Sequence, residues 1–173
     1  DAGMSGEEVR NKLKTERLVS DEKLDLLLST AEHEKAIRAL SGPESVSIYI
    51  SIPFCPSRCS YCSFTSHSIE KAARLIPQYV ELLCEELRET AKLMDELGLR
   101  LETVYMGGGT PTVLTAEQLD KVLSTVRANF DMNTVRELTV EAGRPDTITP
   151  EKLEVMRKNG VGRISINPQT MDD

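Results

Sequence analysis

Three cysteines in one short loop are the residues of this 173-residue chain best suited to chemistry. Cys55, Cys59 and Cys62 are separated by three and then two residues, and they follow an apolar run, 45–52, that is typical of a buried strand. Cubane iron-sulfur sites and structural zinc sites normally use four protein ligands. Three thiolates therefore leave one metal position open, and an open iron can bind a small molecule through an amine and a carboxylate.

S-adenosylmethionine (SAM) carries both of these groups on its methionine end, and with an iron-sulfur partner it supplies radical chemistry. A structural zinc site is the main alternative, with His67 or Cys84 as its fourth ligand. We favour the cluster, because Cys84 falls in a helical pattern and His67 stands alone. Three unrelated buried cysteines would not suit a loop whose other residues are mainly proline, serine and arginine.

The cysteine spacing, with an aromatic residue just before Cys62, resembles the signature of the radical SAM superfamily. Two longer motifs, Tyr-x-x-Ile-Pro-Phe-Cys at 49–55 and Met-Gly-Gly-Gly-Thr-Pro-Thr at 106–112, are similar to the oxygen-independent coproporphyrinogen III oxidase group within it. The likeness runs from about residue 45 to the end of the chain. It implies that the three cysteines hold a 4Fe-4S cluster and that SAM is a cofactor.

The resemblance also places SAM contacts after successive strands. The implied contacts are Tyr49, Tyr61, Gly108, Gly109, Thr110, Glu141 and Gln169. Glycines at 107–109 would let the backbone approach the methionine moiety, and no Gly-Lys-Ser/Thr follows them, as a phosphate loop would require. Gln169 matches a residue that faces a second SAM in the family. Asn-Pro replaces the usual Gly-x pair before it, so the number of SAM molecules, one or two, stays open.

Two of these positions, and the nearby Arg144, can also be explained by local structure. Tyr49 should point inward if the strand alternates, where it would serve equally well as an interior barrel tyrosine. Glu141 ends a buried strand, where a charge is costly unless paired, so we expect it to meet a cation or hydroxyl groups. Arg144 is suited either to binding a carboxylate of SAM or substrate or to closing its own loop.

The elements that must position these residues alternate from residue 45 onward. Strands are expected at 46–52, 103–106, 137–141 and 163–167, with helices at 72–97, 116–130 and 150–159. Thr115 with Gln118 forms a capping box, Pro150 suits a first helical turn, and Gly98 and Gly160 stand where helices stop. We predict an α/β fold: a partial (β/α) radical SAM barrel with its first four parallel strands, whose chemistry gathers at the carboxyl ends of the strands.

A helical segment, 1–44, is expected to precede the partial barrel, 45–173. Ser5 and Glu8 form a capping-box pair for a first helix, a second helix begins near Ser20, and residues 41–44 form a linker. The chain starts with Asp and stops just after a strand. We therefore expect a fragment of a longer enzyme, in which the helical segment acts as an adaptor.

Composition narrows the class of protein. Hydrophobic residues make up 39% and charged residues 28%, as in ordinary globular domains. The formal net charge of -7 argues against nucleic acid as a partner, and no apolar stretch approaches the ~20 residues of a membrane span. Crowded, reduced cysteines favour the cytoplasm over an oxidising compartment.

For activity, the resemblance implies an oxidoreductase of the coproporphyrinogen dehydrogenase branch. A 5′-deoxyadenosyl radical would take hydrogen from a propionate of coproporphyrinogen III, which then loses carbon dioxide to leave a vinyl group on the way to protoporphyrinogen IX in anaerobic haem biosynthesis. The implied partners are a porphyrinogen or haem molecule and an electron donor such as a flavodoxin or ferredoxin.

Phe64 departs from this pattern, because well-established oxidases carry a further cysteine at that position. Haem chaperones that share the fold and the cluster also lack that cysteine. A haem-binding transfer protein therefore stays open as the alternative function, beside another radical SAM activity.

Overall fold

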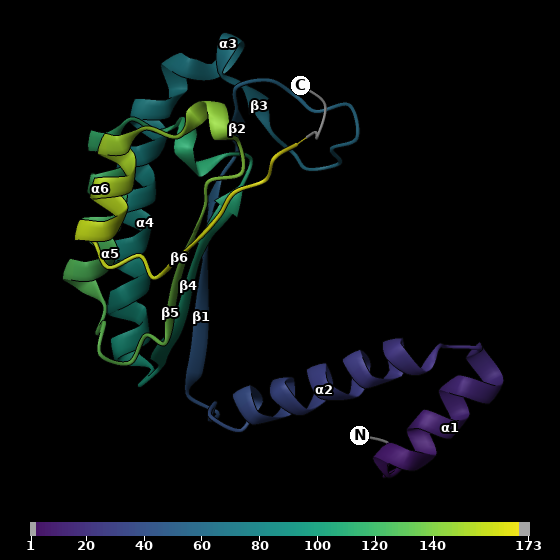
Figure 1. Ribbon diagram of the computed structural model, residues 1–173. Coiled ribbons are helices and arrows are strands. Elements are labelled where there is room, and N and C mark those ends of the chain that lie inside the picture. Colours follow the sequence, from purple (N-terminus) through teal and green to yellow (C-terminus); the bar gives the residue numbers. More distant parts are fainter. Residues whose placement is uncertain (1–2, 170–173) are drawn as a thin grey trace. The chain divides into compact units, whose positions relative to one another are not determined.

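The computed structural model describes residues 3–169 (Figure 1). Contacts within the chain divide it into two compact units, one ending at Pro43 and the other beginning at Glu44. None of the helices in the described range is both long and apolar enough to cross a membrane.

The first unit is a pair of helices, α1 (Gly6–Arg17) and α2 (Asp21–Arg38). Both begin at the expected serines: Ser5 forms a reciprocal capping box with Glu8, and Ser20 accepts a hydrogen bond from the amide of Lys23. The side chains of α2 are mostly exposed, since Leu24 is its only buried residue. Packing thus contributes little to the stability of α2, and the hydrogen bonds that cap the helix contribute a larger share of it.

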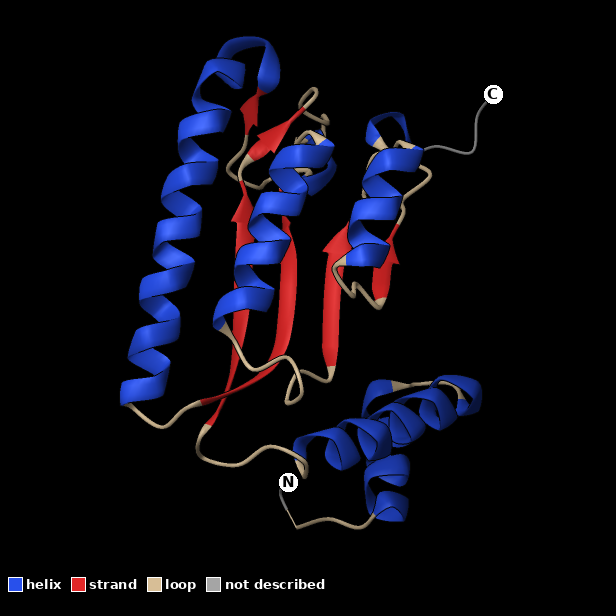
Figure 2. Cartoon of the chain, turned by 90° about the vertical axis from the view of Figure 1, so that its left-hand side faces the viewer, coloured by secondary structure: helices blue, strands red, loops and turns tan. Residues whose placement is uncertain are grey.

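The second unit is built on a parallel sheet in the order β1-β4-β5-β6. Its strands are β1 (Ser45–Ile52), β4 (Arg100–Gly108), β5 (Glu137–Glu141) and β6 (Arg163–Ser165). The helices α4 (Ile76–Glu96), α5 (Ala116–Asn129) and α6 (Pro150–Lys158) all lie against one face of it (Figure 2). The predicted α/β class, with four parallel strands as in a partial radical SAM barrel, is confirmed.

Strand alternation gives the two faces of this sheet opposite characters. Ile50, Ile52, Val104 and Met106 are buried against the helices, and each such side chain contributes about 1.5–3 kcal/mol of transfer free energy. The opposite face, here called the polar face, carries hydroxyl, aromatic and carboxylate groups. Its residues are Ser47, Tyr49, Ser51, Thr103, Tyr105, Glu137, Thr139 and Glu141.

β4 is longer at both ends than the expected 103–106, and the structure differs from the expected elements in three further places. The helix expected from 72 begins only at Ile76, after α3 (Ile69–Ala72) and a 3-10 turn, because Pro77 lacks the amide that a continuous helix would use. β6 ends at Ser165, short of the expected 167. A two-stranded sheet of β2 (Phe54–Cys55) and β3 (His67–Ser68) was not expected, since two residues show no periodicity.

A buried carboxylate joins the amino ends of three strands. Glu102 is 4% exposed, and its Oε1 accepts hydrogen bonds from Ser45 and Arg100, both at 2.8 Å. Arg136, which lies in the segment that leads into β5, donates to Glu102 Oε2 at 2.6 Å. These contacts fix the relative register of β1, β4 and β5 at the end of the sheet away from the cysteines.

We predict that Glu102→Ala lowers the free energy of unfolding by about 2 kcal/mol, because two partly buried guanidinium groups lose their acceptor. Urea unfolding followed by circular dichroism measures this. The matched control is Glu89→Ala, whose carboxylate pairs with Lys92 on an exposed helix surface and should cost less than about 0.5 kcal/mol. Equal losses in the two variants would contradict a stabilising role for the buried cluster.

Candidate functional site

The three cysteines lie on a loop, residues 55–66, whose ends are tied together. Phe54 pairs with His67 and Cys55 with Ser68, and the amide of His67 donates to the carbonyl of Pro53 at 2.8 Å. This segment, here called the cysteine loop, follows the carboxyl end of β1. All three cysteines are free thiols and half-buried, so their sulfur atoms are available as ligands.

Cys55 is held by the loop that follows β4, residues 107–110, here called the glycine loop. The amide of Gly109 donates to the carbonyl of Ile52 at 2.9 Å and that of Thr110 to the carbonyl of Phe54 at 2.8 Å. The Thr110 hydroxyl donates to Cys55 Sγ at 3.6 Å. Together these bonds fix Cys55 at the end of the sheet.

Two glycines are required for this close approach. A Cβ on Gly109 would lie 2.6 Å from the carbonyl oxygen of Phe54 and 3.0 Å from Cys55 Sγ. Gly108 has a φ of +106°, and a Cβ there would lie 2.9 Å from Ser51 Oγ. The glycines thus give the backbone of β1 and β2 room, in addition to the approach to a ligand that the sequence predicts for them.

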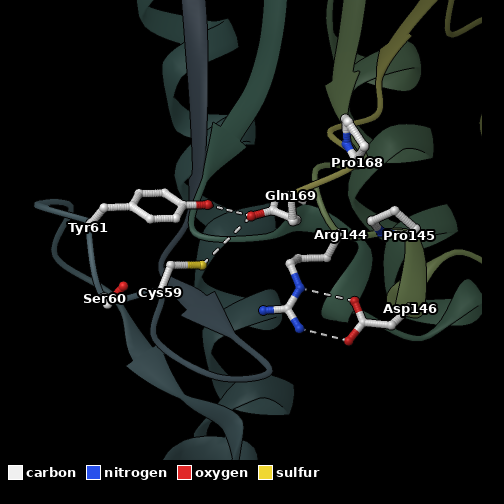
Figure 3. Close-up of a pocket in the computed structure, with 8 residues that line it drawn as sticks. All are labelled: Cys59, Ser60, Tyr61, Arg144, Pro145, Asp146, Pro168 and Gln169. Carbon is white, nitrogen blue, oxygen red and sulfur yellow. Dashed lines mark hydrogen bonds and ion pairs between the residues drawn. The ribbon is translucent and has the colours of Figure 1, made fainter. Parts of the chain in front are cut away.

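Cys59 belongs to a second group of contacts, with Tyr61 and Gln169 (Figure 3). The Tyr61 hydroxyl donates to Gln169 Oε1 at 2.5 Å, and Cys59 Sγ donates to the same oxygen at 3.9 Å. Gln169 Nε2 donates to the carbonyl of Gly143 at 2.8 Å. The side-chain amide therefore connects the cysteine loop to the segments after β5 and β6.

Arg144 makes a further connection. Its guanidinium forms a two-pronged ion pair with Asp146, at 3.0 and 2.8 Å (Figure 3). It also donates to Ser57 Oγ at 3.2 Å. The guanidinium lowers the pKa of the Asp146 carboxyl, chiefly through these hydrogen bonds. Arg144 therefore does close its own loop. The surrounding pocket of about 470 Å³ is lined by Cys59, Ser60, Tyr61, Arg144, Pro145, Asp146, Pro168 and Gln169.

A third group lies on the polar face. Glu141 Oε1 accepts a hydrogen bond from the Tyr105 hydroxyl at 2.6 Å, which confirms that this strand-end carboxylate meets a hydroxyl. Tyr49 stacks on Tyr105, with ring centroids 5.8 Å apart and an interplanar angle of 10°. The sequence did not single out Tyr105. Tyr105 lies two residues before Gly107 on a strand, so strand alternation could have indicated that both residues lie on the same face.

The donor chemistry of the cysteine loop fits an iron-sulfur cluster, because thiolates are its usual ligands. Within residues 3–169, no three His, Cys, Asp and Glu side chains gather around one point as a single metal ion would need. In a cluster, however, each thiolate binds its own iron. The two residues considered as a fourth zinc ligand have other contacts: Cys84 is fully buried and donates to the carbonyl of Lys121, and His67 packs near Phe54.

Comparison with known proteins finds similarity over most of the chain. A family model described as the radical SAM superfamily matches residues 49–173. The oxygen-independent coproporphyrinogen-III oxidase-like protein HemZ of Bacillus subtilis is 40% identical, over 99% of this chain and 35% of its own length. The haem chaperone HemW of the same organism is 36% identical, over 73% of this chain and 32% of its own length.

Among solved structures, coproporphyrinogen III oxidase HemN from Escherichia coli is similar, with a TM-score of 0.62 and 27% identity. The match covers 74% of this chain and 28% of HemN, which is a radical SAM enzyme. The chain thus spans about a third of the length of the curated relatives it matches.

We predict that Gly109→Ala displaces Cys55 and leaves the reconstituted protein with most of its iron and sulfide missing. The new Cβ overlaps the backbone of Phe54, and overpacking of this kind costs ~1–3 kcal/mol. Iron and sulfide analysis after anaerobic reconstitution measures the effect. Gly162→Ala is the control, because a Cβ there meets nothing within 4 Å. Equal iron content in both variants would show that Gly109 does not position Cys55.

Proposed function

The chain belongs to the radical SAM superfamily, and we propose that it forms the cofactor-binding part of an enzyme that converts propionates of coproporphyrinogen III to vinyl groups. The observation that carries this proposal is the similarity to the coproporphyrinogen-III oxidase-like HemZ over 99% of the chain. That match includes the helical unit before Glu44, whereas the HemW match covers 73% of the chain. The similarity to HemZ therefore includes both units of the chain, and the proposal rests on both of them.

In this proposal Cys55, Cys59 and Cys62 hold a 4Fe-4S cluster with one open iron. When bound, the cluster and SAM supply a reducing electron and a hydrogen-atom acceptor for the substrate. The Thr110 hydroxyl, at 3.6 Å from Cys55 Sγ, donates to the thiolate and so stabilises its negative charge. Reduced thiolates also require a reducing compartment, so the proposal places the protein in the cytoplasm with a flavodoxin or ferredoxin as electron donor.

The remaining assigned residues would bind and orient SAM. Gly108 and Gly109 leave the backbone of the glycine loop free of side chains, and Tyr49 and Glu141 present an aromatic ring and a carboxylate from neighbouring strands. The Glu141 carboxylate suits the hydroxyl or amine groups of SAM, which are hydrogen-bond donors. Tyr61 and Gln169 lie beside Cys59 and would contact SAM from the cysteine loop side.

Arg144 supports a substrate that carries carboxylates. Its planar guanidinium already binds the Asp146 carboxylate in two-pronged geometry, which is the arrangement that suits a propionate. In the proposal, a propionate of the substrate or the carboxylate of SAM exchanges with Asp146 at the pocket.

A haem-binding transfer protein is the second candidate. Phe64 favours it, since this exposed aromatic residue stands on the cysteine loop where established oxidases have a further cysteine. The 36% identity to the haem chaperone HemW also favours it. An exposed apolar ring of this kind suits contact with a flat macrocycle as well as packing against a neighbouring segment.

We predict that the full-length, reconstituted protein, incubated anaerobically with SAM, a reductant and coproporphyrinogen III, forms protoporphyrinogen IX and 5′-deoxyadenosine. Product analysis by chromatography and mass spectrometry measures both. Cys59→Ala should reduce both products by at least ~100-fold, because the cluster loses one of its thiolate ligands. Cys84→Ala is the control. This cysteine lies on α4 and is buried in the hydrophobic core, so the variant should still form both products.

The opposite result would assign the second function. Tight haem binding with neither a vinyl product nor 5′-deoxyadenosine would reject decarboxylation and support haem transfer. Equal loss of product in Cys59→Ala and Cys84→Ala would show that general destabilisation, rather than ligand removal, explains the effect.

A further inference from the structure

Tyr105 lies on the polar face and contacts residues of both neighbouring strands. The family motifs assign it no role. It lies one residue before the Met-Gly-Gly-Gly-Thr-Pro-Thr motif, on the strand between β1 and β5. Tyr49 packs against its ring from β1, and Glu141 binds its hydroxyl from β5. Both of these partners are among the expected SAM contacts, so Tyr105 connects two ligand-binding residues.

The register of the sheet explains how the hydroxyl reaches Glu141. Tyr105 pairs directly with Thr139, and Glu141 lies two residues further along β5. The two residues are therefore diagonal neighbours on one face of the sheet, and the long tyrosine side chain reaches the carboxylate, at 2.6 Å. A phenylalanine ring would fill the same space without reaching the carboxylate.

The Glu141 carboxylate is confined on a second side by Gly107. A Cβ at Gly107 would lie 2.8 Å from Tyr105 Cε1 and 2.9 Å from Glu141 Oε2. The missing side chain therefore makes a slot in which the carboxylate lies between the hydroxyl and the backbone of β4. Oε1 accepts the tyrosine hydrogen bond, and Oε2 has no hydrogen-bond donor within the described part of the chain, so it can accept one from a ligand.

Stacking holds the tyrosine itself in place. Tyr49 and Tyr105 are direct neighbours in the β1–β4 register, and their nearly parallel rings restrict rotation of either side chain. The hydrogen bond to Glu141, with burial and the charge of that carboxylate, raises the pKa of Tyr105 to about 12. The hydroxyl is protonated at neutral pH, and the shift extends this protonated range to more alkaline pH.

We infer that Tyr105 is a positioning residue for the SAM site, which fixes the carboxylate of Glu141 through its hydroxyl and the ring of Tyr49 through stacking. Binding groups that are already ordered lose less conformational entropy when the ligand arrives. This inference rests on the proposed assignment of Glu141 to SAM. It does not depend on which substrate the enzyme oxidises.

The test is the Kd for SAM of the full-length, reconstituted protein, measured by anaerobic isothermal titration calorimetry. Tyr105→Phe keeps the stacked ring and removes the hydroxyl, and it should weaken SAM binding roughly tenfold, as loss of a hydrogen bond to a charged group does. Glu141→Gln should weaken binding at least as much. Because the two residues act through one bond, the double variant should bind no more weakly than Glu141→Gln alone.

Thr103→Val is the matched control. Thr103 lies on the same strand and face, and its hydroxyl donates to Ser47 rather than to Glu141, so its SAM affinity should stay within about twofold of the wild type. Thermal melting of each variant without SAM reports the structural cost separately. A lower melting temperature for Tyr105→Phe with unchanged SAM affinity would overturn the inference, as would independent, multiplying effects of Tyr105→Phe and Glu141→Gln.

These outcomes are distinct from failure of the proposed function. Coupling between Tyr105 and Glu141 in SAM binding, without a vinyl product, would reject decarboxylation and keep the inference. A vinyl product together with uncoupled SAM affinities would reject the inference alone.

Discussion

The close backbone contact between the glycine loop and the end of β1 is the constraint on which the candidate site depends. Two amide-to-carbonyl bonds, from Gly109 to Ile52 and from Thr110 to Phe54, continue the pairing of β1 and β4 beyond the sheet. They bring Thr110 to the first cysteine. A side chain at Gly109 would break this contact, because the space is filled by the backbone and by Cys55 itself. The motif residues thus have a structural role beside any contact with SAM.

Around this contact the sheet offers two different surfaces. One face is covered by α4, α5 and α6 and contains the apolar core. The other presents hydroxyls, tyrosines and carboxylates, and the cysteine loop follows β1 at the carboxyl end of the sheet. Because all four strands are parallel, groups that follow different strands reach one edge. Gln169 and Arg144 use this arrangement to contact the cysteine loop from more than 80 residues away in the sequence.

Most of the sheet and its helices could be predicted from the sequence, because β1, β4, β5 and the helices have clear periodicity and caps such as Thr115 with Gln118. The sheet of β2 and β3 is too short to carry a pattern, and Pro77 divides a helix that looks continuous by apolar spacing. Strand alternation could have placed Tyr105 on the polar face, but its diagonal contact with Glu141 follows from the strand register, which the sequence does not define. The pairing of Arg144 with Asp146 depends on loop geometry, which composition does not encode.

In the proposed site, three thiolates leave one cluster iron open for SAM. Electron paramagnetic resonance of the reduced, reconstituted protein shows whether SAM binds that iron. We expect the signal of a 4Fe-4S cluster, with about four irons per chain, whose g values shift when SAM is added. A protein that retains a single tightly bound zinc ion, or a cluster signal that SAM leaves unchanged, would rule out an iron open to SAM.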